Sequence, residues 1–136
     1  MEQDDIQELI NHSHDMAEKL LIHQDGEFYP FGAEIDNQGK LTNIGHHYGD
    51  DFPLSDEHIK ELKKYFEREI GSRRIRAYAI TFDCLAKRDP DAEKTDAIAI
   101  ECYLRDNEQR TIYYFPYRRV TSDELEFGEP WGTSAE

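Results

Sequence analysis

The sequence has few of the features that usually identify a chemistry. It contains only two cysteines, Cys84 and Cys102, and neither belongs to a CxxC pair. The phosphate-binding patterns GxxxxGK(S/T) and GxGxxG and the nucleophile pattern GxSxG do not occur, so nucleotide binding and hydrolase chemistry lack their signatures. No apolar run approaches the roughly 18 residues of a membrane span. The sequence therefore names no reaction, and it argues against a membrane-spanning helix.

Basic residues are scarce at both ends of the chain. The 136 residues include 30 acidic and 16 basic side chains, which gives a formal net charge of -14. Residues 1–57 contain 14 acids and 2 bases, residues 58–119 contain 11 acids and 14 bases, and residues 120–136 contain 5 acids and no base. This balance argues against nucleic acid, because a phosphate backbone needs a positively charged protein surface. The asymmetry indicates either a polarised surface suited to a basic protein partner or ordinary solubilising charge.

The two cysteines are predicted to be buried free thiols, because both lie in apolar, alternating segments. If the segments that contain Cys84 and Cys102 pair across the loop 87–96, the two thiols become candidate neighbours for a disulfide. The acidic N-terminus, MEQDDIQEL, differs from a signal or transit peptide. We therefore expect a cytoplasmic protein, a setting that argues against a disulfide.

Two segments show the three- and four-residue apolar spacing of an amphipathic helix. The first is 4–23, and the second is 56–70, which follows the N-capping residue Ser55 and ends before Gly71. The predicted buried positions are Ile6, Leu9, Ile10, Met16, Ala17, Leu20 and Leu21 in the first helix and Ile59, Leu62, Phe66 and Ile70 in the second.

Five segments read as strands joined by short turns, which makes neighbouring strands antiparallel. They are 27–35, 40–46, 74–86, 97–105 and 109–117. The sequence thus predicts an α+β domain over 1–136, with a five-stranded antiparallel sheet and both helices on a face. The order α-β-β-α-β-β-β matches a profilin-like layout by analogy. Residues 121–136 are expected to form a partly ordered acidic tail.

Two candidate sites for chemistry have weak support. The loop containing His46, His47, Asp50 and Asp51 offers imidazoles and carboxylates, but no metal-ligand spacing accompanies them. A metal site at His46, His47 and Asp50 is therefore an alternative, and surface histidines are the default. Asp83 and Glu101 could form a carboxylate pair for acid–base work, but the sequence shows no cleft to hold them.

A binding surface is the better-supported candidate. If Ile98, Ile100, Cys102 and Leu104 face the helices, then Glu101, Tyr103 and Arg105 point the other way together with Ala99. The last strand adds either Tyr113, Phe115 and Tyr117 or Ile112 and Tyr114 to that side, and tyrosine and arginine are typical of interface centres. The alternative is that these rings are core, and Trp131 is expected to pack back onto the body. The predicted contact residues are Asp50, Asp51, Glu101, Tyr103, Arg105 and Tyr113.

A hairpin segment carries a family resemblance. The run Phe28-Tyr29-Pro30-Phe31-Gly32-Ala33, followed by Ile35-Asp36, Gly39-Lys40 and Gly45, resembles small bacterial proteins of unassigned function, some of which are suspected immunity proteins of polymorphic toxins. The resemblance spans residues 28–45 and implies a compact domain that binds and blocks a cognate toxin. It implies no catalytic residue.

The sequence therefore favours a non-enzymatic acidic protein-binding domain that needs no cofactor, with a basic toxin as the partner that the resemblance implies. The alternative is a small metal- or ligand-binding enzyme domain that uses the loop from His46 to Asp51. A homodimer that pairs through an edge strand is a third possibility.

Overall fold

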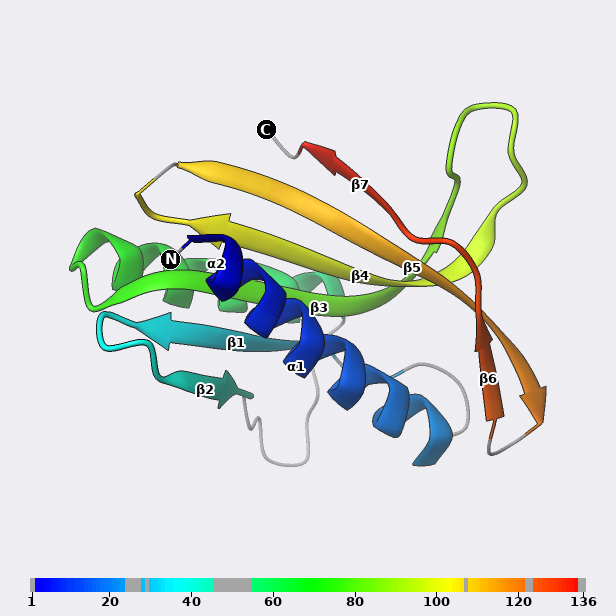
Figure 1. Cartoon of the computed structure of the whole chain (residues 1–136), viewed down its shortest axis with the longest axis horizontal. Helices are drawn as coiled ribbons and strands as arrows, with labels where there is room; N and C mark the ends of the chain where they lie inside the picture. Colours follow the sequence, from blue (N-terminus) through cyan, green and yellow to red (C-terminus); the bar gives the residue numbers. More distant parts are fainter. Residues whose placement is uncertain are drawn as a thin grey trace.

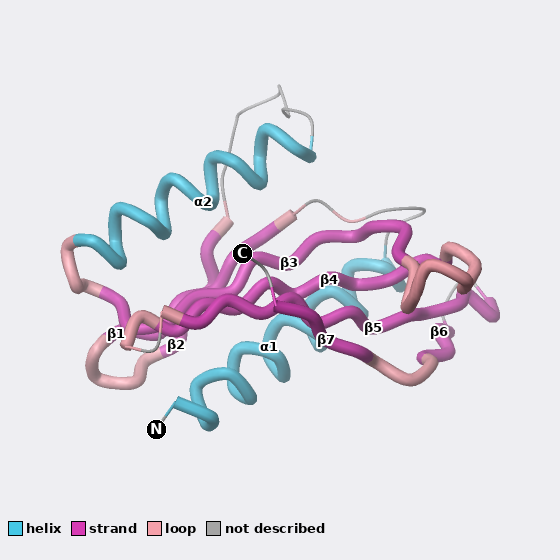
Figure 2. The backbone as a smooth tube through the Cα atoms, turned by 90° about the horizontal axis from the view of Figure 1, so that it is seen from above, coloured by secondary structure: helices cyan, strands magenta, loops and turns pink. Residues whose placement is uncertain are grey.

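The computed structural model describes residues 2–23, 28, 30–45, 55–106, 108–121 and 124–134. One antiparallel sheet runs through the molecule, and one helix lies on each side of it (Figure 1, Figure 2). The α+β class is confirmed. Neither described helix is long and apolar enough to cross a membrane.

Helix α1 (Glu2–His23) buries every fourth residue against the sheet. Leu9, Ala17 and Leu21 are fully buried, and the predicted apolar neighbours Ile6 and Ile10 pack beside them. Because residues four apart lie on one face of a helix, this spacing turns one stripe of α1 toward the sheet. The helix packs on β1, β3, β4 and β6, and it therefore crosses most of one sheet face (Figure 1).

The sheet contains seven strands where the sequence predicted five. Its order is β2-β1-β3-β4-β5-β6, and β7 also pairs with β5. The strands are β1 (Phe31–Asp36), β2 (Leu41–Ile44), β3 (Ile75–Ala86), β4 (Thr95–Leu104), β5 (Gln109–Thr121), β6 (Glu124–Phe127) and β7 (Trp131–Ser134). The two additional strands lie in the segment expected to form a tail, and both pair with β5 because it is long enough to carry them end to end.

Helix α2 (Ser55–Gly71) lies on the opposite face from α1 (Figure 2). Its buried positions Leu62 and Phe66 form a second core cluster with Ile75, Tyr78 and Ile80 of β3. The first cluster, between α1 and the sheet, contains Ile98, Ile100, Cys102 and Leu104 of β4, which share a face as predicted. The expectation that both helices cover one face is therefore wrong. Residues of both parities in β3 are apolar because each face of that strand meets a helix.

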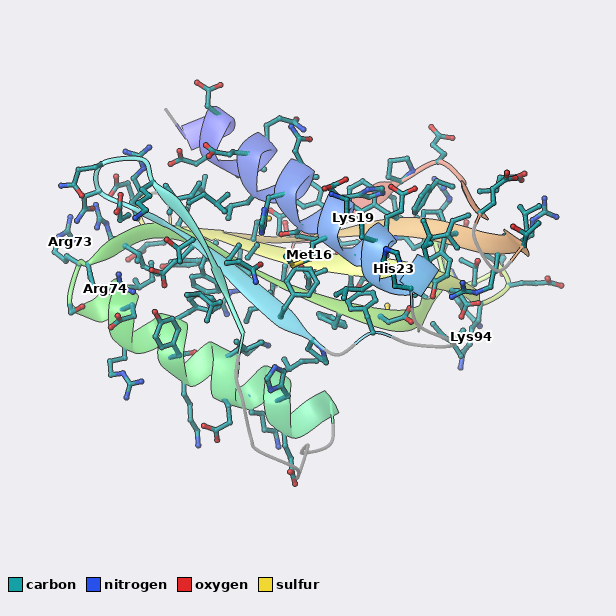
Figure 3. All side chains as sticks on the ribbon, turned by 90° about the horizontal axis from the view of Figure 1, so that it is seen from below. Met16, Lys19, His23, Arg73, Arg74 and Lys94 are labelled. Carbon is teal, nitrogen blue, oxygen red and sulfur yellow. The ribbon has the colours of Figure 1, made fainter. Side chains whose placement is uncertain are left out.

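Ion pairs between buried carboxylates and partly exposed arginines join the helices to the sheet at one end of the molecule. Arg76 of β3 donates to both carboxylate oxygens of Asp5 in α1, each at 2.9 Å. Arg74 donates to both oxygens of Glu34 in β1, at 2.8 and 2.9 Å, and Tyr65 of α2 donates to Glu34 at 2.8 Å. In Figure 3 Arg74 lies at this end of the molecule. Such paired and hydrogen-bonded charges fix where each helix sits.

A close approach at Gly32 brings α2 onto the sheet. A Cβ atom at this position would lie 2.6 Å from Cζ of Phe66, whose ring is buried and stacked on Tyr78. We expect Gly32→Ala to lower the free energy of unfolding by about 1–3 kcal/mol, because the ring has no space to withdraw into. Urea unfolding measures this change. Gly71→Ala is the matched control, because nothing lies within 4 Å of a Cβ at Gly71, and its effect should stay within about 0.5 kcal/mol. Equal stabilities of the two variants would contradict this packing.

We expect the stability of the contact between α1 and the last part of the sheet to depend on pH through His14. Its ring lies 4.9 Å from Phe115 and 4.6 Å from Phe127, and burial lowers the pKa of His14, opposed by the nearby Glu18 and Asp15. The unfolded chain then binds the proton more readily than the folded one, so stability should fall as the pH drops below about 6.5. We expect a smaller loss on acidification in His14→Phe, which keeps a ring but cannot titrate. Urea unfolding from about pH 7.5 to about pH 5 tests this, and parallel curves would refute it.

Candidate functional site

The candidate site is the part of the α2-side sheet face that lies beyond α2. Helix α2 packs on β3 and β1, whereas β4, β5 and β7 continue the sheet past it. Cross-strand partners share a face of a sheet, and the register aligns Tyr103 with Arg110, Glu101 with Ile112, Ala99 with Tyr114, and Tyr114 with Trp131. We call this surface the open sheet face. Its residues are Ala99, Glu101, Tyr103, Arg110, Ile112, Tyr114 and Trp131.

Rings of the open sheet face take part in two stacked pairs. Tyr103 stacks on the buried Tyr78 with ring centres 5.5 Å apart, and Tyr114 stacks on Trp131 at 5.2 Å. Tyr103, Ile112, Tyr114 and Trp131 are half-buried, so part of each side chain reaches solvent. Burial raises the pKa of Tyr78 to about 12 and also raises the pKa of Tyr114, so both phenols are neutral hydrogen-bonding groups at neutral pH.

Three charged side chains, Glu101, Lys63 and Arg110, lie beside these rings and form a charged triad. Glu101 is only 4% exposed, and two cations approach it: Lys63 Nζ of α2 lies 3.7 Å from Oε1 and Arg110 Nε of β5 lies 3.6 Å from Oε2. The Arg110 guanidinium also stacks over the Tyr103 ring at 5.2 Å and donates to the Tyr78 hydroxyl at 3.0 Å. A buried carboxylate therefore sits between two partly exposed cations beside aromatic rings.

Trp131 closes the far edge of the open sheet face. Besides stacking on Tyr114, its ring lies 4.9 Å from the guanidinium carbon of Arg88, which comes from the connector between β3 and β4. Arg88 also donates a hydrogen bond to the carbonyl of Glu129, just before β7. The contact joins two distant segments, and together with the stacking on Tyr114 it shows that Trp131 packs back onto the body as predicted.

The predicted contact residues separate into different places. Glu101 and Tyr103 lie on the open sheet face. Arg105 lies at the end of β4, where its Nη1 donates to Asn37 Oδ1 and to the Ile75 carbonyl, each at 3.0 Å, so its side chain is only 14% exposed. Tyr113 faces the other way and packs against the α1 cluster. Of the four predicted contact residues that the structure describes, two are thus brought together. Asp50 and Asp51, together with the alternative metal ligands His46 and His47, lie outside the described residues.

The other sequence candidates are not brought together. Asp83 and Glu101 lie on opposite faces of the sheet, because Asp83 accepts a 2.8 Å hydrogen bond from Tyr117 on the α1 side. Cys84 pairs in register with Ala97 and Cys102 with Ala79, so the two thiols are on different faces and cannot form a disulfide. Burial raises the pKa of Cys84 to about 11 and that of Cys102 to about 12, which keeps both protonated. Within the described ranges no three His, Cys, Asp or Glu side chains are grouped as metal ligands.

A separate hollow of about 190 Å³ lies where β5 runs on to pair with β6. Its only charged side chains, Arg118 and Glu126, bind each other at 2.9 Å and are largely exposed. The lining residues are Thr95, Pro116, Tyr117, Arg118, Glu126, Phe127 and Gly128. This open and charge-balanced hollow offers less for recognition than the open sheet face.

The acidic segments do not gather on one surface. The outer side of α1 exposes Asp4, Glu8 and Asp15, and its single base, Lys19, pairs with Asp15 at 2.9 Å. The acidic first hairpin, β1 and β2, lies toward one edge of the sheet, and the acidic C-terminal segment lies at the other. The outer face of α1 is therefore one of several acidic regions among the described residues, and α1 lies on the other side of the sheet from α2 and the open sheet face (Figure 2).

Sequence reasoning missed part of the open sheet face for a specific reason. The sequence does not decide whether Tyr113 with Phe115 or Ile112 with Tyr114 lies on this face, because residues of both parities in β5 are apolar. Only the register with β4 places Ile112, Tyr114 and Arg110 beside Glu101 and Tyr103. No sequence signal places Lys63 beside Glu101.

No family model, curated protein or solved structure matches this chain. The residues and geometry of the open sheet face are therefore the basis for assigning a function.

The contact between Arg88 and Trp131 can be tested by fluorescence, because Trp131 is the chain's single tryptophan. We expect Arg88→Ala to move the Trp131 emission to longer wavelength and to speed amide exchange in β7, because the ring and the strand lose a partner. Lys87→Ala is the control, since Lys87 is an exposed neighbour. An Arg88→Ala spectrum and exchange rates identical to those of the control would show that the contact does not hold β7.

Proposed function

We propose that this chain is a non-enzymatic protein-binding domain that docks its partner on the open sheet face. The observation that carries the proposal is the row of half-buried rings, Tyr103, Tyr114 and Trp131, on β4, β5 and β7 beyond α2. Large amphipathic rings on a rigid support lose little conformational freedom on binding, which is why they dominate interface centres. A triad of charges within the rings adds the polar contacts that orient a partner.

The partner that we propose carries a basic surface. The net charge of -14 and the acidic outer side of α1 create a negative field around the molecule. Such a field speeds the encounter with a cationic protein, whereas contacts within the interface decide how long the complex lasts. We propose that the open sheet face supplies these contacts, because its charges are of both signs and lie beside aromatic rings. The resemblance of residues 28–45 to suspected immunity proteins favours a specific version of this proposal, in which the chain inhibits a basic toxin.

The state of the nucleophiles supports binding over catalysis. Both thiols are held protonated by burial, and the carboxylates Asp83 and Glu101 are separated by the sheet. The charged groups of the open sheet face contact one another and the rings around them.

Affinity capture with matched variants tests the proposal. The immobilised wild-type protein is exposed to lysate of the native host, and a retained protein is identified and then purified. We expect Tyr114→Ala to weaken its binding by about tenfold or more, because a central ring of the interface is lost. Gln7→Ala, on the exposed side of α1, is the control and should bind like wild type. Circular dichroism of each variant checks that the fold is intact.

Salt dependence tests the charge of the partner. The association rate should fall between about 50 mM and about 300 mM salt, because ions screen the attraction over a Debye length. A partner retained equally by wild type and Tyr114→Ala would contradict docking on the open sheet face. A wild-type dimer in light scattering that Tyr114→Ala converts to monomer would show that a second copy occupies the face instead.

A further inference from the structure

Two complementary polar atoms in the open sheet face have no hydrogen-bond partner among the described residues. Within the described part of the chain, Glu101 Oε2 accepts no hydrogen bond and Arg110 Nε donates none, although both atoms are buried. They lie 3.6 Å apart, which is beyond the distance of a formed N–H···O bond. Leaving buried donors and acceptors unmade is costly, and each such group needs an explanation.

The two other buried carboxylates among the described residues form hydrogen bonds with their arginine partners. Asp5 with Arg76 and Glu34 with Arg74 are bonded at 2.8 to 2.9 Å. The Arg110 guanidinium instead stays stacked over Tyr103 and bonded to the Tyr78 hydroxyl, and these contacts keep Nε away from Glu101. The wide separation of Glu101 and Arg110 therefore follows from where the two tyrosines hold the guanidinium.

A group placed between these atoms must donate one hydrogen bond to Glu101 Oε2 and accept one from Arg110 Nε. A carboxylate only accepts and an ammonium or guanidinium only donates. A hydroxyl does both through a single oxygen, whereas a carboxamide donates from its nitrogen and accepts at its oxygen, so that two adjacent atoms of one planar group face the two protein atoms. Charge gives the same answer, because Glu101 already faces the two cations Lys63 and Arg110. A third cation would be repelled by them, and an anion would be attracted by the two cations but would lie directly against the buried carboxylate oxygen Oε2, so only a neutral group meets no like charge.

Lys63 is a side chain that can move to admit such a group. It reaches Glu101 from α2 at 3.7 Å, and its own side chain is 41% exposed. Lys63 forms no hydrogen bond to Glu101 at this distance, so its exposed end can turn toward solvent when an incoming group supplies the hydrogen bond that the buried carboxylate then needs. The rings of Tyr78 and Tyr103, which already stack on one another, border the position.

We propose that Glu101 and Arg110 form a recognition position for a neutral carboxamide, and that the partner docking on the open sheet face inserts an asparagine or glutamine side chain there. The inference rests on the proposed function and specifies the chemistry of the same surface. The negative field of the molecule attracts the partner, and this position selects a neutral group at the centre of contact.

An isosteric series of small probes tests this assignment directly. Acetamide donates and accepts, acetone only accepts, acetate is an anionic acceptor, and acetamidinium is a cationic donor. Each is titrated into the ¹⁵N-labelled full chain while the Arg110 Nε–Hε resonance is followed, with Arg110→Lys identifying that signal. We expect acetamide to shift it saturably, and acetone to require about tenfold higher concentration because one hydrogen bond is missing.

Variants of the triad separate recognition from general solvent effects. In Glu101→Met the preference for acetamide over acetone should vanish, because the acceptor is gone while the length of the side chain is kept. Lys63→Met should strengthen acetamide binding by removing the ammonium that covers Glu101. Lys64→Met is the matched control on the exposed side of α2 and should leave the titration unchanged.

Each other result overturns the assignment. Strongest binding by acetamidinium would mean that the position takes a cationic residue, and strongest binding by acetate would mean an anionic one. A resonance that no probe shifts, in wild type and in Lys63→Met, would mean that only internal water serves these atoms. A partner lost in Tyr114→Ala but bound normally by Glu101→Met would leave the docking surface standing and reject the carboxamide.

Discussion

Two helices cannot cover both faces of a seven-stranded sheet, and the architecture of this protein follows from that shortage. A helix with its side chains is about 10 Å wide and strands are about 4.8 Å apart, so a helix lying along the strands covers about two of them. Helix α1 crosses from β1 to β6 and serves one face, whereas α2 serves β1 and β3 on the other. Beyond α2, the described side chains of that second face pack against one another. They are chiefly tyrosines, an arginine and Trp131.

Three buried carboxylates differ in how completely their cations bind them. Asp5 with Arg76 anchors α1, and Glu34 with Arg74 and Tyr65 anchors α2, each with formed hydrogen bonds. The third carboxylate, Glu101, lies at the margin of α2, and its two cations are 3.6 and 3.7 Å away, too far for a formed hydrogen bond. The satisfied clusters hold elements in place. Glu101 lies where α2 ends its contact with the sheet and the open sheet face begins. This is why we regard it as a position for recognition.

Much of the fold was predictable from local pattern. The apolar spacing of 4–23 and 56–70 predicted two helices that agree with α1 and α2 to within two residues at each end. The alternation of Ile98, Ile100, Cys102 and Leu104 predicted a shared buried face, and these side chains do pack in one cluster. The number of strands was underestimated, because β6 and β7 are only four residues long and depend on pairing with β5. The candidate site was half predictable, since Glu101 and Tyr103 were assigned together but Arg105 and Tyr113 were not separated from them.

By itself the sequence determined the helices, the main strands, the strong acidity and the apolar alternation of β4, because these depend on residue type and on spacing along the chain. The tertiary structure alone decided which face each helix covers, how β5 is registered against β4, and which cations meet Glu101. The physical reason is that β3 and β5 carry apolar residues on both parities, so local pattern cannot orient them. Only pairing with β4 and the area left uncovered by α2 choose the side on which Tyr103, Tyr114 and Trp131 meet.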